Sequence, residues 1–589
     1  MGSIGTEARR SWWKECSVYQ IYTPSFKDSN GDGIGDLRGV MSKLDYIQSL
    51  GVDMIWLNPV FKSPQVDMGY DISDYFDIHP PYGTATDVDE LTEAVHRRGM
   101  KLVMDLVVNH TSDQHPWFQA SRSSLASEHR DWYIWKKPTF DEHGKSQPPN
   151  NWASYFGGSA WEYDEASGEY YLHLFAKQQP DLNWENPTVR AAVENIMRYW
   201  LDKGVDGFRM DVINFISKQM HFPDAPITNK NSVWQNGAKY YACGPRLHEY
   251  LHNIGKILKE YDAFSVGEMP EVNDCDEVLK AVGFDREELS MIFHFELMGL
   301  DHGAGGKFTP RKWKMQELKS VVSKWQKVMH EKSGWNALYL ENHDQPRAVS
   351  RFAIDHPQYR ALSAKLLATF LGFQNGTVFI YQGQELGMAN VPHDWTIDHY
   401  RDIETLNHWA EFLATRGEKT ASHTATLAEY RKKSRDNART PMQWDSSAHA
   451  GFSSAIPWIS VHEDYPVWNA TAQVADAKSV YHYWASVLRL RKSCPDVFVY
   501  GSFELVSRDD AEVFAYSRHS STNTALVVLN FEPREVSWTM PKNLFCGQAA
   551  EVLLSNYTRS KASTIACETL TLAPLEAFVL LGVTSSSRL

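Results

Sequence analysis

Residues 207–212 read Gly207-Phe208-Arg209-Met210-Asp211-Val212, an apolar run interrupted by one arginine and one aspartate. Successive side chains of a strand point to opposite faces, so Arg209 and Asp211 face the same way and can touch. The run predicts a strand that is buried on both faces, as in a parallel sheet. We expect Arg209 to keep the Asp211 carboxylate ionised near neutral pH, which suits a nucleophile better than a proton donor.

Similar apolar runs recur along the chain and alternate with amphipathic helical patterns, such as those at 37–50, 87–98 and 187–202. The eight predicted strands are 18–22, 54–58, 101–107, 207–212, 264–268, 291–297, 336–341 and 377–381. Eight repeats of a strand and a helix predict an α/β fold of the (β/α)8 TIM-barrel type. The active site of such a barrel lies at the carboxyl ends of its strands.

Two further segments do not follow this alternation. Residues 110–184 are too long for one helix, and long insertions in compact domains are usually functional. We therefore predict a small inserted domain after the third strand, leaning over the barrel mouth. Beyond residue 502, short β runs at 513–517, 524–531, 534–540, 551–556 and 577–582 predict a C-terminal antiparallel β-sandwich. The predicted domains are a barrel (1–109 and 185–502), an insertion (110–184) and a sandwich (503–589).

Composition limits the possible partners and the compartment. The 589 residues carry a formal net charge of −14 without a long basic run, which argues against nucleic acid and anionic membranes. No apolar stretch of about 18 residues predicts a membrane span, and we expect no secretory signal. Together with scattered cysteines, these features predict a cytoplasmic protein; the cysteines are Cys16, Cys243, Cys275, Cys494, Cys546 and Cys567.

Three acidic residues, Asp211, Glu268 and Asp344, end or follow predicted strands. The carboxyl ends of barrel strands meet at one face, so we expect these side chains to lie together. Paired carboxylates cleave glycosidic bonds, and the sequence therefore predicts an acid/base site for that chemistry. At the same face His110 is expected to hydrogen-bond a substrate, and Asp105 to orient its neighbours.

Other hydrolase classes fit less well. No HxxxH or HxH spacing occurs near the strand ends, so we expect no catalytic metal or other catalytic cofactor. No G-x-S-x-G elbow suggests a serine hydrolase. The segment Asp67-Met68-Gly69-Tyr70-Asp71 follows the second strand. There Tyr70 is expected to stack on a sugar ring and Asp67 to hold its hydroxyls; for Asp71 the alternative is a hydrogen-bond acceptor within the turn.

Residues 28–36 repeat oxygen-bearing side chains at alternate positions. The pattern matches the first, third and fifth ligand positions of an EF-hand loop, but Gly39 stands where the bidentate glutamate would be. We predict one structural Ca²⁺; its ligands would be Asp28, Asn30, Asp32, the carbonyl of Ile34, and Asp36. The alternative is an Asx-rich turn without metal.

Taken together, these motifs resemble the α-amylase clan of glycoside hydrolases, and most closely its oligo-1,6-glucosidase, isomaltase and maltase branch of fungal intracellular type. The resemblance covers nearly the whole chain. The motifs that carry it are 105–110, 207–212, Gly267-Glu268, Asn342-His343-Asp344, 178–183, 381–385 and 434–444.

The resemblance implies a retaining, exo-acting α-glucosidase. Asp211 would be the nucleophile, Glu268 the general acid/base and Asp344 the residue that stabilises the transition state. The implied pocket for the terminal glucose consists of Asp67, Tyr70, His110, Phe175, Gln178, Arg209, His343 and Arg439. Val212, directly after the nucleophile, is implied to favour α-1,6 bonds, with maltose as a further substrate.

The implied partners are small α-glucosides, namely malto- and isomalto-oligosaccharides, with sucrose as a further candidate and transglucosylation at high substrate. One alternative is a transglucosidase or a sucrose-acting enzyme of the same branch. Residues 300–303 lack the Arg-Leu-Asp-Arg-Asp motif of its sucrose isomerases, which disfavours isomerisation. A second alternative is a non-catalytic, transporter-associated relative. Such relatives typically lose one of the three carboxylates, and all three are present here.

Overall fold

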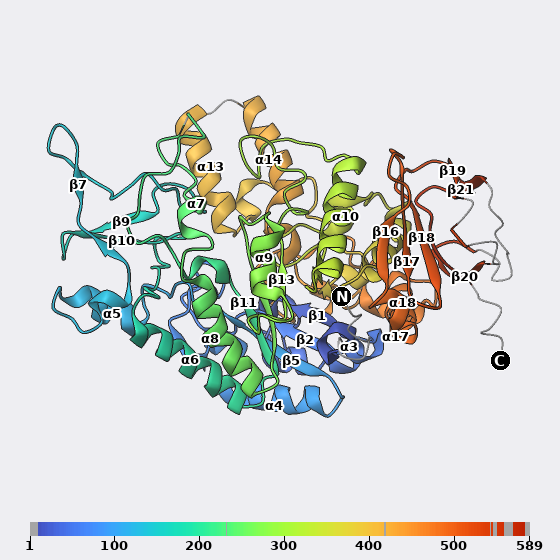
Figure 1. Ribbon diagram of the computed structural model, residues 1–589, viewed down its shortest axis with the longest axis horizontal. Coiled ribbons are helices and arrows are strands. Elements are labelled where there is room, and N and C mark those ends of the chain that lie inside the picture. Colours follow the sequence, from blue (N-terminus) through green and yellow to red (C-terminus); the bar gives the residue numbers. More distant parts are fainter. Residues whose placement is uncertain are drawn as a thin grey trace.

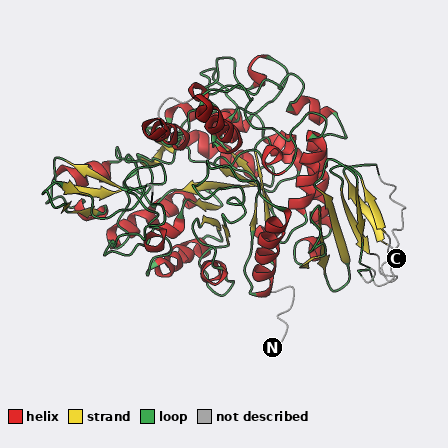
Figure 2. Cartoon of the chain, turned by 90° about the horizontal axis from the view of Figure 1, so that it is seen from above, coloured by secondary structure: helices red, strands yellow, loops and turns green. Residues whose placement is uncertain are grey.

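The computed structural model describes residues 10–230, 232–416, 420–541, 544–545, 550–558 and 569–582. Three parts lie in a row in Figure 1: a small lobe at the left, a barrel in the middle and an antiparallel β-domain at the right. Helices surround the central strands when the chain is seen from above (Figure 2).

Eight parallel strands form the central barrel, as the sequence predicts. In chain order they are β1 (Ser17–Ile21), β2 (Met54–Leu57), β5 (Lys101–Leu106), β11 (Gly207–Met210), β12 (Phe264–Glu268), β13 (Met291–Phe293), β14 (Ala337–Leu338) and β15 (Thr377–Tyr381). Their spatial order is β13-β12-β11-β5-β2-β1-β15-β14. A parallel bridge between Ile292 and Asn336 joins the two ends and completes the ring.

The strands at 291–297 and 336–341 are shorter than predicted. β14 stops at Leu338 because the segment after it is held by a turn and not by a neighbouring strand. There Glu341 accepts hydrogen bonds from the Arg347 side chain, at 3.1 Å, and from the Ala348 amide. The chain thus leaves the barrel early and enters the loop that carries Asp344.

One predicted helix is confirmed and another is broken in two. The segment 187–202 is helix α6 (Pro187–Asp202), capped by Asn186 and begun by a proline at its first position. The segment 37–50 instead forms two helices, α2 (Leu37–Met41) and α3 (Leu44–Leu50). The break follows from Ser42, whose hydroxyl donates to the Gly39 carbonyl at 2.6 Å and offers that acceptor an alternative to the helix.

The inserted lobe is built on a three-stranded antiparallel sheet, β6 (Trp135–Lys136), β10 (Glu169–Leu172) and β9 (Trp161–Asp164). Its buried cluster includes Trp152 and Leu174 from the lobe itself. Phe215, from the turn that follows β11, belongs to the same cluster. The lobe therefore packs directly on the barrel segment that carries Asp211.

The C-terminal domain is antiparallel throughout. Five strands, β16 (Ser502–Leu505), β17 (Val513–His519), β18 (Thr524–Asn530), β22 (Ala577–Gly582) and β20 (Ala550–Ser555), form one sheet. A two-stranded sheet, β19 (Val536–Thr539) and β21 (Thr569–Leu572), packs against it. Along β17, Phe514 joins the core shared with the barrel while Val513 joins the cluster between the two sheets. The sequence patterns did not predict β16 and β21, which are strands of four residues each.

Two buried arginines, one from the barrel and one from this domain, bind the same stretch of the barrel. Arg491, on α17 (Val480–Ser493), donates to the carbonyls of Gly372 at 2.9 Å and Gln374 at 2.7 Å. Arg518, on β17, donates to the carbonyl of Phe373 at 2.7 Å. These carbonyls lie at or just beyond the end of α12 (Arg360–Gly372), where the helix leaves its acceptors unpaired. The C-terminal sheet thus helps to cap a barrel helix.

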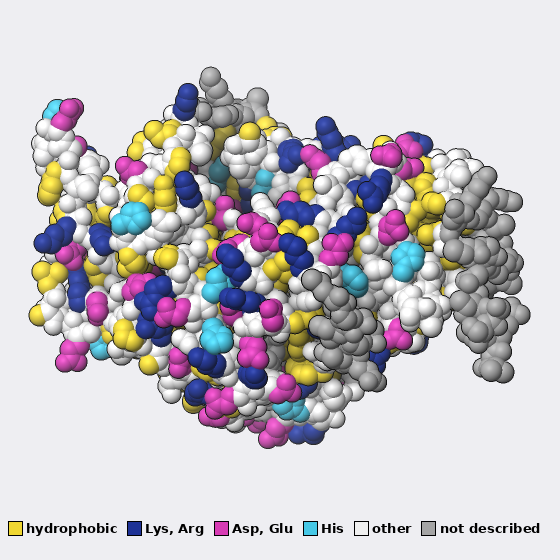
Figure 3. All heavy atoms as spheres, in the orientation of Figure 1, with side chains coloured by type: hydrophobic (Ala, Val, Ile, Leu, Met, Phe, Trp, Pro, Cys, Tyr) yellow, Lys and Arg dark blue, Asp and Glu magenta, His cyan; other side chains and the backbone are white. Residues whose placement is uncertain are grey.

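Within the described ranges, no helix is long and apolar enough to cross a membrane. Acidic and basic side chains are interspersed over the face shown in Figure 3. Cys16, Cys243, Cys275 and Cys494 are free thiols, whereas Cys546 and Cys567 lie outside the described residues. The reducing compartment inferred from the cysteines stays a prediction.

Candidate active site

The strand register places the central residues of the site. Arg209 on β11 lies opposite Asp105 on β5 and Val266 on β12. Side chains two residues apart share a face. Asp211 and Glu268 therefore stand one step nearer the carboxyl ends of the strands than this row, and Arg209 reaches both from below.

One guanidinium contacts three carboxylates. Arg209 Nη1 lies 2.5 Å from Asp105 Oδ1 and 3.0 Å from Asp211 Oδ1, and Nη2 contacts Glu268 Oε1. Trp56 Nε1 donates to the second Asp105 oxygen at 2.7 Å. Arg209 is fully buried, so these carboxylates supply the charge that a buried guanidinium requires.

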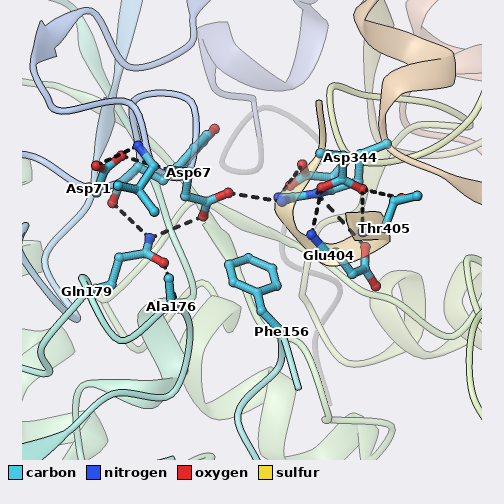
Figure 4. Close-up of polar contacts among 12 residues, drawn as sticks. Asp67, Asp71, Phe156, Ala176, Gln179, Asp344, Glu404 and Thr405 are labelled. Atoms are coloured by element: carbon cyan, nitrogen blue, oxygen red, sulfur yellow. Dashed lines mark hydrogen bonds and ion pairs between the residues drawn. The ribbon is translucent and has the colours of Figure 1, made fainter. Parts of the chain in front are cut away.

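A second arginine cluster holds Asp344. Arg439 Nη2 lies 2.7 Å and Arg435 Nη1 3.3 Å from Asp344 Oδ1, and His343 Nε2 lies 3.1 Å from Oδ2. Arg435 also reaches Asp67 at 3.0 Å. Figure 4 shows Asp67 between Gln179 on one side and Asp344 with Glu404 on the other. These loop residues form the wall that faces the strand-end acids.

A cavity of about 210 Å³ lies between the two clusters. Its volume is below the roughly 300–1,000 Å³ of pockets for drug-sized ligands, so it suits one small ring. Its ionisable lining includes Asp67, His110, Asp211, Glu268, Asp344 and Arg435. Its aromatic lining includes Tyr70, Tyr155, Phe156, Phe175, Phe215 and Phe295.

Most residues proposed from the sequence meet here. Asp67, Tyr70, His110, Phe175 and Val212 line the cavity together with the three acids. Arg209, His343 and Arg439 are buried behind this lining.

The structure assigns two glutamines and one arginine to positions that the sequence did not predict. Gln178 lies outside the cavity lining, and its neighbour Gln179 donates to Asp67 Oδ2 at 3.1 Å. Arg435 was missed, although it lines the cavity. Its spacing of four from Arg439, in the 434–444 motif, was the available signal, because residues at i and i+4 share a helix face.

The backbone is strained directly after Asp211. Val212 has φ 34° and ψ 44°, the left-handed region, which a β-branched residue rarely adopts. Such a conformation costs about 1–3 kcal/mol and is typical of functional sites. The amide of Asp211 donates to the Leu106 carbonyl at 3.1 Å, and that of Phe215 to the Val212 carbonyl at 2.9 Å. This turn directs both Asp211 and Val212 into the cavity.

Burial raises the pKa of both strand-end acids. The pKa of Asp211 is raised to about 7 and that of Glu268 to about 8, with Arg209 opposing both shifts. The sequence suggested that Arg209 would keep Asp211 ionised at neutral pH, but burial and the neighbouring carboxylates outweigh the arginine. The charge of Asp211 adds to the shift of Glu268, so an ionised Asp211 favours a protonated Glu268.

Asp344 behaves in the opposite way. Burial opposes its ionisation, but His343, Arg435 and Arg439 hold its pKa well below the usual value. Burial lowers the pKa of His343 to about 4, so that imidazole is neutral at neutral pH. The two arginines therefore supply the stabilising charge, and Asp344 remains a permanent carboxylate beside two titrating acids.

In the loop at 28–36, side-chain oxygens accept hydrogen bonds from backbone amides of the same loop. Asp28 accepts from the amides of Asn30 and Gly31, and Asp36 caps α2 by accepting from the Gly39 amide at 2.6 Å. No group of three His, Cys, Asp or Glu side chains in the described part of the chain is arranged to hold a metal. These contacts are those of the Asx-rich turn, so the Ca²⁺ site stays a prediction.

Comparisons with known proteins agree with this geometry. Residues 20–501 match the model of the α-amylase catalytic domain, and residues 503–579 match that of the maltogenic amylase C-terminal domain. An α-glucosidase of Schizosaccharomyces pombe is 54% identical over 93% of this chain and 94% of its own. An oligo-1,6-glucosidase of Parageobacillus thermoglucosidasius is 50% identical over 97% of this chain and 99% of its own.

Solved structures are similarly close. A trehalose-6-phosphate hydrolase of Bacillus licheniformis superposes with a TM-score of 0.90 at 42% identity, covering 98% of this chain and 100% of that one. An isomaltulose synthase of Erwinia rhapontici, in complex with sucrose, superposes with a TM-score of 0.91 at 39% identity, with the same coverage.

The raised pKa of Glu268 predicts that Glu268→Gln stabilises the fold at high pH. A buried carboxyl with a raised pKa stabilises the fold fully only below its unfolded pKa, near 4.5, and this contribution is lost as pH rises through about 8. We expect Glu268→Gln to match the wild type at pH 5 and to gain about 1–3 kcal/mol at pH 8.5, after allowance for the lost Arg209 contact. Thermal unfolding at both pH values measures this.

The matched control is Asp402→Asn. Burial opposes the ionisation of Asp402, but Arg435 lowers its pKa to about 2. Its contribution to stability is therefore present above its unfolded pKa, and the variant should be less stable than the wild type at both pH values. A Glu268→Gln protein that is less stable at pH 8.5 would contradict the assignment.

If residues 28–36 bind Ca²⁺, a chelator should lower the melting temperature more than the initial rate, because none of these residues lines the cavity. Asp32→Ala, which removes one proposed ligand, should abolish the difference between calcium-supplemented and chelated protein. Equal melting temperatures of the wild type with and without calcium would favour the Asx-rich turn.

Proposed function

The chain belongs to the α-amylase family of glycoside hydrolases, and we propose that it is a retaining, exo-acting enzyme that releases terminal non-reducing glucose from short α-glucosides. The α-glucosidase or oligo-1,6-glucosidase activity is supported by relatives that are 54% and 50% identical over nearly the whole chain. The observation that carries the mechanism is the contact of one guanidinium, Arg209, with both Asp211 and Glu268.

In the first step, Glu268 donates its proton to the glycosidic oxygen while Asp211 attacks the anomeric carbon. The bond between carbon and oxygen breaks, the aglycone leaves as an alcohol, and a glucosyl ester forms on Asp211. In the second step the Glu268 carboxylate takes a proton from water, whose oxygen attacks the same carbon and releases Asp211. Two inversions give α-glucose with net retention.

Arg209 keeps the charge of the site constant during this exchange. Before the first step Asp211 is the anion and Glu268 the acid; afterwards Asp211 is a neutral ester and Glu268 the anion. Arg209 contacts Asp211 through Nη1 and Glu268 through Nη2. The negative charge therefore passes from one carboxyl group to the other while it stays in contact with the same guanidinium. Fixed charges placed in this way favour the transition state without reorganisation.

The shape of the cavity supports release of one glucose at a time. Arg435 bridges Asp67 and Asp344 in the wall of a space that holds about one ring, roughly 210 Å³. Chain ends can enter such a pocket, whereas the middle of a chain cannot. A sugar that replaces water in the second step would give transglucosylation at high substrate.

The mouth favours neutral aglycones. Lys307 lines the cavity, but its ammonium is paired with Glu404 at 2.6 Å. A phosphorylated aglycone would have to compete with that carboxylate. We therefore propose uncharged disaccharides, with isomaltose and maltose as substrates, and not sugar phosphates.

Retention and the identity of the nucleophile are tested together. ¹H NMR during the first turnovers of maltose or isomaltose should show α-glucose before mutarotation. A 5-fluoro-α-glucosyl fluoride should label the wild type, with the added mass on the peptide that contains Asp211. Asp211→Asn and Glu268→Gln should each lose most turnover because each removes a group of the covalent cycle.

Asp164→Asn is the matched control, since Asp164 is also buried but pairs with Arg122 in the inserted lobe. It should keep near-normal rates. Initial release of β-glucose, or a mass adduct on the Asp211→Asn variant, would overturn the mechanism.

Linkage preference is assigned to Val212. Its apolar side chain lines the cavity beside the nucleophile, where the aglycone sugar must lie. Threonine has a similar volume but offers a hydroxyl, and one such contact can discriminate by about 1–3 kcal/mol. We expect Val212→Thr to raise kcat/KM for maltose relative to isomaltose, whereas Val212→Ala, which changes volume alone, should not. An unchanged ratio in Val212→Thr would move specificity to the loops around the mouth.

A further inference from the structure

A second cavity lies at the end of the barrel that faces away from the acids. Lys14, Trp335 and Asn375 line it and come just before β1, β14 and β15, so it lies at the amino ends of these strands. Ser521, from the turn between β17 and β18, lines its other wall. Figure 1 shows helix α10 (Met315–Glu331) beside β16 at this junction. The junction cavity has a volume of about 420 Å³, twice that of the cavity at the acids, and suits a small-molecule ligand.

Basic side chains outnumber acidic ones in the lining of the junction cavity. Arg10 and Lys14 belong to this lining, and Asp496 is the one carboxylate among its described residues. Arg10 Nη2 lies 3.0 Å from Asp496 Oδ1, but the Asp496 side chain is 74% exposed, so solvent screens its charge. Lys14 is buried, and its Nζ lies 3.6 Å from the centroid of the Phe284 ring. The chain as a whole has a formal net charge of −14, so this cavity differs in sign from the rest of the protein.

Two buried guanidinium groups lie directly behind the wall of the junction cavity. Arg518 donates to the carbonyl of Gly501, a lining residue, at 2.7 Å. Arg491 donates to the carbonyls that precede and follow Asn375, the first of them at 2.7 Å. Among the described residues, neither arginine pairs with a carboxylate. Burial lowers the pKa of Arg491 to about 10 and that of Arg518 to about 9, so both groups are charged at neutral pH.

The simpler role of these two arginines is to cap α12, but that role leaves positive charge uncompensated. The carboxyl end of a helix carries roughly half an elementary negative charge, whereas the two guanidinium groups carry a full positive charge each. Backbone carbonyls solvate these groups without neutralising them, so a positive potential extends into the junction cavity. An anion bound there would supply the missing negative charge.

The side chain of Asn375 adds a buried acceptor that lacks a donor. Asn375 is 1% exposed, and its Nδ2 donates to the Val499 carbonyl at 2.6 Å. A carbonyl only accepts, so the amide atom that faces it must be the nitrogen. The other amide atom, Oδ1, is buried without a hydrogen-bond partner among the described residues. A buried acceptor without a donor costs free energy, and a ligand hydroxyl in the junction cavity would remove that cost.

We propose that the junction cavity binds a small phosphate monoester that carries hydroxyl groups, of the size of a hexose phosphate. A phosphate monoester has a charge of about −1.5 to −2 at neutral pH, which matches the two guanidinium groups behind the wall. The phosphate would also contact Arg10 at the opening, and a hydroxyl would donate to Asn375 Oδ1. Such a ligand touches both the barrel and the C-terminal domain, so its binding stabilises their junction.

Calorimetric titration with glucose 6-phosphate as the probe tests this proposal. The titration contains 1-deoxynojirimycin, a cationic glucose analogue that suits the acidic active site and not the basic junction cavity. Glucose and inorganic phosphate each lack one of the two recognised groups, so each should bind about tenfold more weakly than the probe. Raising the salt concentration should weaken the probe, because screening reduces the attraction between the phosphate and the arginines.

Two exposed positions of the lining allow variants that leave the fold intact. Ser521→Glu adds a carboxylate to the junction cavity, and Arg10→Gln removes a cation; each should weaken the probe by about tenfold. The control for the first is Thr522→Glu, the same change one residue further on and outside the lining. The control for the second is Arg311→Gln, since Arg311 is also about half exposed and pairs with one carboxylate, that of Glu317. Both controls should bind the probe like the wild type.

Thermal unfolding gives a second readout that, like the titration, does not depend on hydrolysis. The probe should raise the melting temperature of the wild type and of both controls, and should raise that of Ser521→Glu much less. A wild type that binds no probe, or lining variants that bind it like the wild type, would overturn the inference and leave Arg491 and Arg518 as helix caps. Binding that disappears when 1-deoxynojirimycin is added would place the probe at the acids and would overturn it as well. Inorganic phosphate that binds as tightly as glucose 6-phosphate would overturn the assignment of a phosphate ester.

Discussion

The ion pairs of Arg209 are the constraint on which the barrel and its chemistry both depend. A guanidinium without partners in the interior would cost several kcal/mol, and three carboxylates without a cation would repel one another. Asp105, Asp211 and Glu268 therefore need Arg209 as much as it needs them. A slip of one residue turns every side chain of a strand to its other face. The charges thus help to hold β5, β11 and β12 in a single register.

The opposite wall follows the same principle but is made of loops. Arg435 binds Asp402 at 2.6 Å, Asp67 at 3.0 Å and Asp344 at 3.3 Å, which come from three distant parts of the chain. The Asp402 and Asp67 side chains are buried, and that of Asp344 is 30% exposed at the cavity. Moving these loops apart would leave the buried Arg435 guanidinium without its partners. The result is a cavity with rigid walls in which Asp211 and Glu268 have raised pKa values. Those raised values destabilise the fold at high pH, which is the cost of holding the proposed acid, Glu268, in its protonated form beside Asp211.

The barrel strands and the three acids could be predicted from the sequence because each is marked by a short, continuous pattern of residues. A run such as 264–268 is apolar along its whole length, and Glu268 is where that run ends. Arg435 has no local signal of this kind, since its partner Asp67 is 368 residues away. The choice between Gln178 and Gln179 depends on how the inserted lobe turns its backbone toward the barrel. The pKa of Asp211 could not be inferred from the neighbouring arginine alone, because burial contributes most to the shift.

The turn after β11 connects Asp211 to the inserted lobe. Val212 occupies a strained backbone conformation, Phe215 packs in the core of the inserted lobe, and Lys218 binds Asp181 of that lobe. Asp211, the proposed nucleophile, is thus fixed from below by the strand register and from above by the lobe. Substitutions in the outer loops can reshape the mouth without moving Asp211, because Arg209 and the register of β11 with β5 and β12 hold it from within the barrel.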